Sequence, residues 1–95
     1  MFEILVIYTA KSKEHANDFV CKMTESGVLD AIRAEDGCLK YEYFSNGKDT
    51  ILLYEAWESP EHQKIHMTQQ PHMKTAMEIK QKYIDNVLIK KLTDL

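Results

Sequence analysis

Two segments of the chain are each predicted to form a β-strand with apolar side chains on both of its faces. In residues 2–9 and in residues 50–57, hydrophobic side chains occupy both sets of alternating positions. A strand of this kind needs apolar cover on both sides of its sheet. Helices of the same chain can cover one side, so we expect a second copy of the chain to cover the other. The alternative is a monomer with scattered exposed aliphatic side chains, which are common on protein surfaces.

Helical periodicity follows the first of these strands. Ser12 is suited to cap the start of a helix, and Gly27 marks a break in the helical pattern. Gly37 marks the end of the helical region, because glycine is favoured just after a helix C-terminus. The spacing predicts a long amphipathic helix after Ser12 and a further helical turn or two over residues 28–32. The apolar stripe of the first helix is formed by Ala16, Phe19, Val20 and Met23.

The rest of the chain is predicted to form a hairpin, a second helical region and a last strand. Residues 38–44 and 50–57 lie on either side of Asn46-Gly47, a strong hairpin turn signal. Ser59-Pro60 opens a helix, because Ser suits the N-cap and Pro the first helical position. The remaining expected features are a helix to about residue 69, a restart at Pro71, a break at Asp85-Asn86 and a strand over residues 87–92.

These elements follow the order β-α-β-β-α-β, which is the split βαβ pattern of ferredoxin-like domains. We therefore predict an α+β fold with an antiparallel four-stranded sheet and the helices on one face. A homodimer through the free sheet face would then be a dimeric α/β-barrel. A chain of 95 residues fits one domain, which we place at residues 1–95.

The charge distribution narrows the expected partners and location. The formal net charge is −3, and lysine and arginine residues are scattered along the chain, so nucleic acid is not an expected partner. No apolar run is long enough for a membrane span, and no signal peptide is recognisable. We therefore expect a cytoplasmic protein in which Cys21 and Cys38, which do not form a CxxC pair, stay reduced.

Three of the four histidines, His62, His66 and His72, lie within one short stretch. Three interpretations compete for them: a metal site, general acid–base chemistry, and an ordinary structural histidine. The ordinary interpretation is favoured for His15 and His62. For His66 the choice stays open.

A metal site could use His62 and His66, which are four residues apart on one helix and share a face. It would need a third ligand such as Glu55, Glu58 or His72, and no established metal motif is present, so we expect no metal. There is also no phosphate loop, nucleophile elbow or flavin fingerprint. The chain is too short to enclose a dinucleotide in the usual way, and we expect no tightly held cofactor.

Glu55 lies between Leu53 and Trp57 on one face of the strand over residues 50–57. Burial of a carboxylate there is costly without a partner. Glu55 therefore pairs with a cation, reaches water at the strand end, or forms a polar fixture inside an apolar pocket. Tyr41 could add a hydroxyl group to such a pocket, although tyrosine in a sheet first of all packs.

Four groups of residues occur in an order and spacing that resemble a known family. They are Glu35-Asp36-Gly37-Cys38-Leu39-Lys40-Tyr41, Tyr54-Glu55-Ala56-Trp57-Glu58-Ser59, His66 and Pro71-His72-Met73-Lys74. The set resembles the antibiotic biosynthesis monooxygenase (ABM) domain family of small quinol-monooxygenase-like proteins, to which autoinducer-2-degrading proteins are related. The resemblance covers nearly the whole chain.

The resemblance implies a dimeric ferredoxin-like fold and oxidation of electron-rich aromatic or quinol substrates by O₂, without metal or flavin. It makes His66 the candidate catalytic acid–base group. It makes Trp57, Glu55, His72 and Tyr41 candidate substrate-binding residues. The first strand lacks the asparagine of the haem-degrading branch, which disfavours that activity.

Three functions stay open from the sequence. The first is a cofactor-independent monooxygenase acting on a small aromatic or quinol-like metabolite. The second is a related enzyme acting on a small carbonyl signal metabolite, and the third is a non-catalytic dimeric binding or stress-response module. An apolar cavity of a few hundred Å³ reached by His66 would favour an enzyme. A filled core with His66 bonded to backbone would favour the module.

Overall fold

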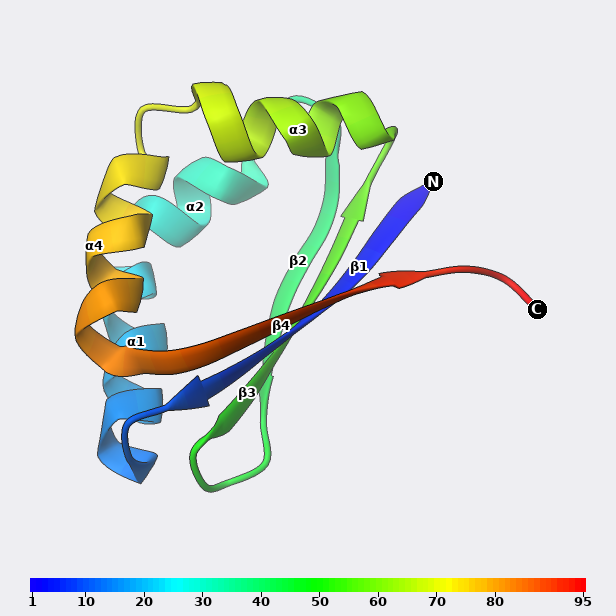
Figure 1. Ribbon diagram of the computed structural model, residues 1–95. Coiled ribbons are helices and arrows are strands. Elements are labelled where there is room, and N and C mark those ends of the chain that lie inside the picture. The colour runs from blue at the N-terminus through cyan, green and yellow to red at the C-terminus, as the bar shows by residue number, and fades with distance from the viewer.

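The computed structural model describes residues 1–95 and consists of one antiparallel four-stranded sheet with four helices (Figure 1). The sheet has the strand order β2-β3-β1-β4, and every neighbouring pair is antiparallel. This confirms the ferredoxin-like α+β fold that the sequence predicts. The elements are β1 (Phe2–Ala10), α1 (Lys13–Glu25), α2 (Val28–Arg33), β2 (Cys38–Ser45), β3 (Thr50–Trp57), α3 (Pro60–Gln69), α4 (Met73–Tyr83) and β4 (Ile84–Leu92).

The last strand begins earlier than the sequence predicts. α4 ends at Tyr83, and the next residue, Ile84, already has an extended backbone with φ −109° and ψ 131°. The expected break at Asp85-Asn86 is wrong, because both residues belong to β4. The register of β1 against β4 shifts at this point, which leaves Asp85 as the extra residue of a β-bulge. Two residues that usually favour turns therefore lie inside a strand, at its β-bulge.

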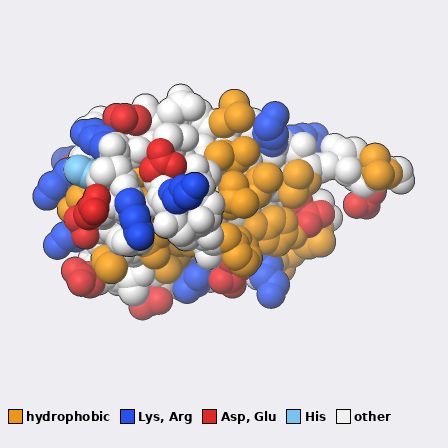
Figure 2. Space-filling view, turned by 90° about the horizontal axis from the view of Figure 1, so that it is seen from below, with side chains coloured by type: hydrophobic (Ala, Val, Ile, Leu, Met, Phe, Trp, Pro, Cys, Tyr) orange, Lys and Arg blue, Asp and Glu red, His pale blue; other side chains and the backbone are white.

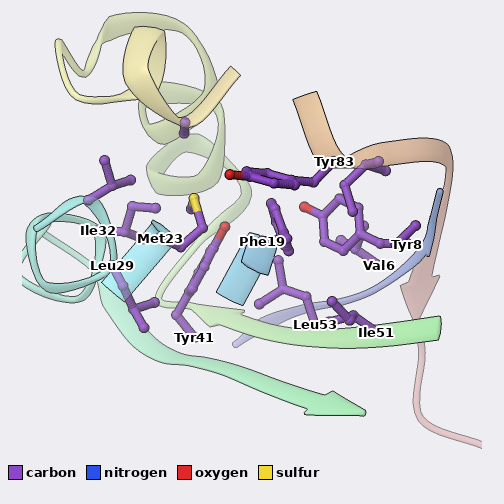
Figure 3. Packing of buried hydrophobic residues seen from close by; sticks show 14 of the residues in the cluster. Val6, Tyr8, Phe19, Met23, Leu29, Ile32, Tyr41, Ile51, Leu53 and Tyr83 are labelled. Carbon is purple, nitrogen blue, oxygen red and sulfur yellow. The ribbon is translucent and has the colours of Figure 1, made fainter. Parts of the chain in front are cut away.

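One face of the sheet packs against the helices and forms the hydrophobic core (Figure 3). Alternate residues of the two central strands, β1 and β3, are buried on this side. Helices α1 and α2 supply the facing side chains, and Phe19 packs against the ring of Tyr8 with centroids 5.3 Å apart. The most deeply buried side chains of this layer include Tyr8, Phe19, Met23, Ile32, Tyr41, Ile51, Leu53 and Trp57.

The opposite face of the sheet is largely uncovered in the single chain. Ile7 of β1 pairs with Leu52 on one side and with Leu88 on the other, so the three side chains share this face. Leu88 is 48% exposed, and Phe44, opposite Leu52 on β2, is 57% exposed. Figure 2 shows hydrophobic side chains gathered on the surface near the C-terminal tail. The prediction that the strands are apolar on both faces is confirmed.

No helix of the chain has the length and hydrophobicity needed to cross a membrane. Cys21 and Cys38 are both free thiols. Burial is the main reason that the pKa of the Cys38 thiol is raised to about 11.

Two contacts at the N-terminus of α3 hold this helix in place: the Ser59 cap and the close packing of His62 on Gly37. Ser59 caps the helix by accepting a hydrogen bond from the backbone N–H of His62. The imidazole of His62 packs against Gly37, where any Cβ would collide with it. Gly37 has φ +79°, and its carbonyl accepts a hydrogen bond of 2.8 Å from the N–H of Glu58. His62 is therefore half-buried, with a structural role at the start of the helix.

We expect Gly37→Ala to destabilise the protein by more than Gly27→Ala. Both glycines have positive φ, where a Cβ costs about 1–2 kcal/mol. A Cβ at Gly27 meets nothing within 4 Å, whereas at Gly37 it meets the His62 ring. Urea unfolding followed by the fluorescence of Trp57, the single tryptophan, measures both changes. Equal losses of stability would mean that Gly37 is needed only for its backbone conformation.

Candidate functional site

A cavity of about 330 Å³ lies between the sheet and the helices α3 and α4. It extends along β4, whose helix-side residues are only partly covered: Val87 is 45% exposed and Ile89 is 62% exposed. Most of its wall is hydrophobic, which suits an apolar ligand. The hydrophobic lining residues include Ile4, Val6, Met67, Met77, Ile84, Val87 and Ile89.

The structure brings three of the five sequence-predicted site residues to this cavity. Tyr41, Glu55 and His66 line it. Trp57 and His72 are not lining residues. Trp57 is fully buried and contacts both Glu55 and His66. His72 forms the N-cap of α4 and hydrogen-bonds to Glu35.

Glu55 is a buried carboxylate whose partner comes from its own strand. Its Oε1 accepts a hydrogen bond of 3.0 Å from the indole N–H of Trp57. Its Oε2 makes no hydrogen bond and is not sealed from solvent, so it faces the cavity. Burial raises the pKa of Glu55, whereas the Trp57 hydrogen bond and the nearby His66 and Lys80 side chains act to lower it. Of the alternatives open from the sequence, the geometry agrees with a hydrogen-bonded polar side chain on the wall of an apolar pocket.

Lys80 and two tyrosines add further polar groups to the cavity wall. Burial lowers the pKa of the Lys80 ammonium, and the charge of Glu55 opposes this shift. Lys80 Nζ lies 5.7 Å from the centroid of the Tyr8 ring. Burial is the largest cause that raises the pKa of Tyr8 and of Tyr41. Both phenols therefore stay protonated at neutral pH.

His66, on α3, packs against two aromatic rings of the sheet. Its centroid lies 4.8 Å from that of Trp57 and 5.7 Å from that of Tyr41. Its side chain is 1% exposed. These contacts leave the imidazole little freedom to rotate, so the direction in which each ring nitrogen points is fixed by packing.

The two ring nitrogens of His66 have different surroundings. Nδ1 lies 2.8 Å from Oε2 of Glu35, and the same oxygen lies 2.6 Å from Nε2 of His72. A carboxylate only accepts hydrogen bonds, so with Glu35 ionised both of these nitrogens carry a proton. Nε2 of His66 then has a free lone pair, makes no hydrogen bond in the chain, and is not sealed from the cavity. This arrangement presents a proton acceptor to a bound ligand.

Sequence reasoning did not single out Glu35 or Lys80 as functional. Glu35 is 31 residues from His66 in the chain, and no local pattern links them. Its signal is indirect: a buried histidine needs a hydrogen-bond partner, and an acidic residue after α2 is one of several candidates. In the sequence Lys80 cannot be distinguished from the other lysines of α4. Only the packing of this helix against the sheet places Lys80 at the cavity.

No three His, Cys, Asp or Glu side chains are arranged so that they could hold a metal ion. His62, considered with His66 as a possible ligand pair, instead lies with Nδ1 2.7 Å from Oγ of Ser59. Its Nε2 lies 3.5 Å from Asp36.

The family model for antibiotic biosynthesis monooxygenase (ABM) matches residues 4–79, which run from within β1 to within α4. The chain belongs to the ABM family. The family resemblance inferred from the sequence is therefore confirmed. No curated protein matches the chain at a significant level.

Solved structures share the fold of this ABM-family protein over nearly its whole length. A candidate antibiotic biosynthesis monooxygenase from Deinococcus radiodurans is 21% identical, covers 99% of this chain and 92% of its own, and has a TM-score of 0.81. One from Nitrosomonas europaea is 15% identical, with coverages of 100% and 99% and a TM-score of 0.80. A Streptomyces coelicolor monooxygenase in complex with nanaomycin D is 17% identical, with coverages of 99% and 88% and a TM-score of 0.75. At these identities the similarity establishes the fold.

We expect Glu55→Gln to stabilise this ABM-family protein at neutral pH but not at pH 4. The folded state raises the pKa of Glu55 mainly through burial, so folded Glu55 binds a proton more tightly than unfolded Glu55. Stability is therefore lost as pH rises from the ordinary glutamate pKa through the folded one. Gln keeps an acceptor for Trp57 and has no charge to desolvate.

The measurement is urea unfolding at pH 4 and pH 7. Glu78→Gln, an exposed position on α4, is the matched control and should change stability little at either pH. A gain of the same size at both pH values would show that the charge of Glu55 is not the destabilising feature.

Proposed function

We propose that this ABM-family protein is a monooxygenase that oxidises a small aromatic or quinol-like metabolite with O₂, taking the electrons from the substrate itself. The observation that supports it most is the apolar cavity of about 330 Å³ with the unbonded Nε2 of His66 on its wall. A cavity of this size holds a compact aromatic molecule. The bond of His66 to Glu35, and not to backbone, also favours an enzyme over the binding module.

In the proposed reaction, Nε2 of His66 takes the hydroxyl proton of the bound phenol or quinol. The resulting anion is electron-rich enough to reduce O₂. Lys80, Tyr8 and Tyr41 line the same cavity, and their ammonium and hydroxyl groups would stabilise the developing negative charge. Glu55, which accepts the hydrogen bond of the Trp57 indole N–H, would complete the polar side of the pocket. His72 acts behind His66 and does not touch the substrate.

The atoms balance without an external reductant. When a ring C–H of a phenol becomes C=O, one oxygen atom of O₂ enters the product. The other oxygen leaves as water with the ring hydrogen and the hydroxyl hydrogen. His66 would take the second of these as a base and return it as an acid. The complex of nanaomycin D with the Streptomyces coelicolor monooxygenase supports binding of an organic ligand by this fold.

We expect O₂ uptake with some members of a panel of hydroquinones, naphthols and polyphenols, above the spontaneous rate. His66→Ala should lower kcat by about 10²-fold or more, the usual contribution of a general base. His15→Ala on α1 is the control, because His15 bonds to Ser12 and does not line the cavity. An oxygen electrode measures the rate, and mass spectrometry with ¹⁸O₂ detects one labelled atom in the product.

Wild-type uptake no faster than background across the panel would refute the oxygenase proposal. Equal rates for wild type and His66→Ala would keep the oxygenase and remove His66 from its mechanism.

We also propose that a second copy of the chain covers the free face of the sheet. Ile7, Leu52 and Leu88 form a continuous apolar surface there, and no helix of the chain covers it (Figure 1). A stable contact of this kind buries about 800 Å² per partner. The second copy would be related by a two-fold axis, so the same residues would meet on both sides.

We expect wild-type protein to have twice the mass of the 11.1 kDa chain in light scattering at micromolar concentration. Leu52→Glu should shift it towards the single chain, because a charge would be buried in the contact. Ile65→Glu is the matched control, since Ile65 is an exposed aliphatic residue (40%) on α3, away from the sheet face. A wild-type mass of one chain would contradict the dimer.

A further inference from the structure

We infer that Glu35 and His72 are positioning residues that prepare His66 to accept a proton. Glu35 fixes the tautomer of His66 and supplies the negative charge that balances the imidazolium. His72 holds Glu35 in place from the opposite side. The catalytic meaning of this inference rests on the proposed function, whereas the tautomer that it assigns to His66 does not.

The geometry that carries the inference is one carboxylate oxygen between two imidazoles. Oε2 of Glu35 lies 2.8 Å from Nδ1 of His66 and 2.6 Å from Nε2 of His72. The three residues come from the segment after α2, from α3 and from the N-terminus of α4. Such a contact forms only when the two helices are docked on the same loop. The turn at Gln70, which has extended backbone (ψ 127°), brings His72 back to the carboxylate that His66 already uses.

The burial of the three side chains separates their roles. His66 is 1% exposed, Glu35 is 3% exposed and His72 is 18% exposed. His66 alone of the three lines the cavity. An imidazolium formed at His66 by taking a proton from a ligand would be almost fully buried, and a buried charge needs a counter-charge. Glu35 is the carboxylate that contacts it.

A purely structural role explains the site poorly. Oε1 of Glu35 is buried and has no hydrogen-bond partner, which is costly for a carboxylate. A neutral or apolar side chain would fill the space behind His66 at lower cost. A carboxylate with one orphaned oxygen is therefore expected where its charge is used, and the charge is used when Nε2 of His66 becomes protonated.

The first experiment reads the tautomer of His66 by ¹H–¹⁵N NMR of uniformly labelled protein without substrate. We expect wild-type His66 to carry its proton on Nδ1 and to have an unprotonated Nε2. Glu35→Leu should produce the Nε2–H form, because no acceptor then faces Nδ1. Glu35→Gln should keep the Nδ1–H form, because an amide oxygen can still accept the bond.

Asp36→Asn is the matched control, since Asp36 is the neighbouring acid, is exposed, and pairs with His62 instead of His66. It should leave the His66 tautomer unchanged. Urea unfolding of each variant shows that it is folded at the temperature of the NMR experiment. A wild-type His66 with a protonated Nε2, or a tautomer that does not change in folded Glu35→Leu, would overturn the inference.

The second experiment separates charge from position through activity. With the substrate that gives the highest O₂ uptake, Glu35→Gln should lower kcat at least tenfold with little change in KM, because the acceptor remains and the counter-charge is lost. His72→Leu should lower kcat, and His72→Gln, which restores an N–H donor to Glu35, should recover most of it. Equal activity of His72→Leu and His72→Gln would remove His72 from the inference.

The two experiments fail independently. Absence of O₂ uptake in wild type, with the Nδ1–H tautomer present and dependent on Glu35, would refute the proposed oxygenase and leave the positioning of His66 standing. O₂ uptake that depends on His66, with unchanged kcat in Glu35→Gln, would keep the oxygenase and refute the role of the Glu35 charge.

Discussion

The burial of β1 at the centre of the sheet is the constraint on which the rest of the structure depends. β1 pairs with β3 on one side and β4 on the other, so it has no free edge. Its residues Val6 and Tyr8 pack under the helices, while Leu5 and Ile7 form the middle of the opposite face. The helices also cover the helix-side residues of β3, but they leave most of β4 exposed on both faces. The cavity lies at the edge of the region that the helices cover, next to β4, whose apolar side chains are not fully packed.

The polar part of the site follows from the cost of placing charge in that cavity. Glu55 is retained on a core-facing position because the indole of Trp57 donates to it and the ammonium of Lys80 lies near. His66 is retained because Glu35 receives its Nδ1–H. Trp57 contacts both groups, so one fully buried ring fixes the carboxylate on β3 and the imidazole on α3 relative to each other.

Much of the fold could be predicted from local sequence patterns because those patterns act over a few residues. The bounds of β3 and α3 agree with the alternation over residues 50–57 and with the Ser59-Pro60 helix start. The prediction failed at Asp85-Asn86, where residues that favour turns lie inside β4. Pairing with β1 provides hydrogen bonds that offset this local preference, and the bulge at Asp85 absorbs the extra residue. A single strand segment cannot reveal which partner it will have.

The sequence by itself determined the order of the elements and the two apolar faces of the central strands, and it singled out His66, Glu55 and Tyr41 as candidate site residues. These depend on periodicity and on short motifs, which are properties of neighbouring residues. Only the tertiary structure decided that Glu35 binds His66 and His72 through one oxygen, and that Trp57 lies behind the cavity wall. Those contacts join segments up to 37 residues apart. Their geometry is set by how helices α3 and α4 dock on the sheet, which no local pattern encodes.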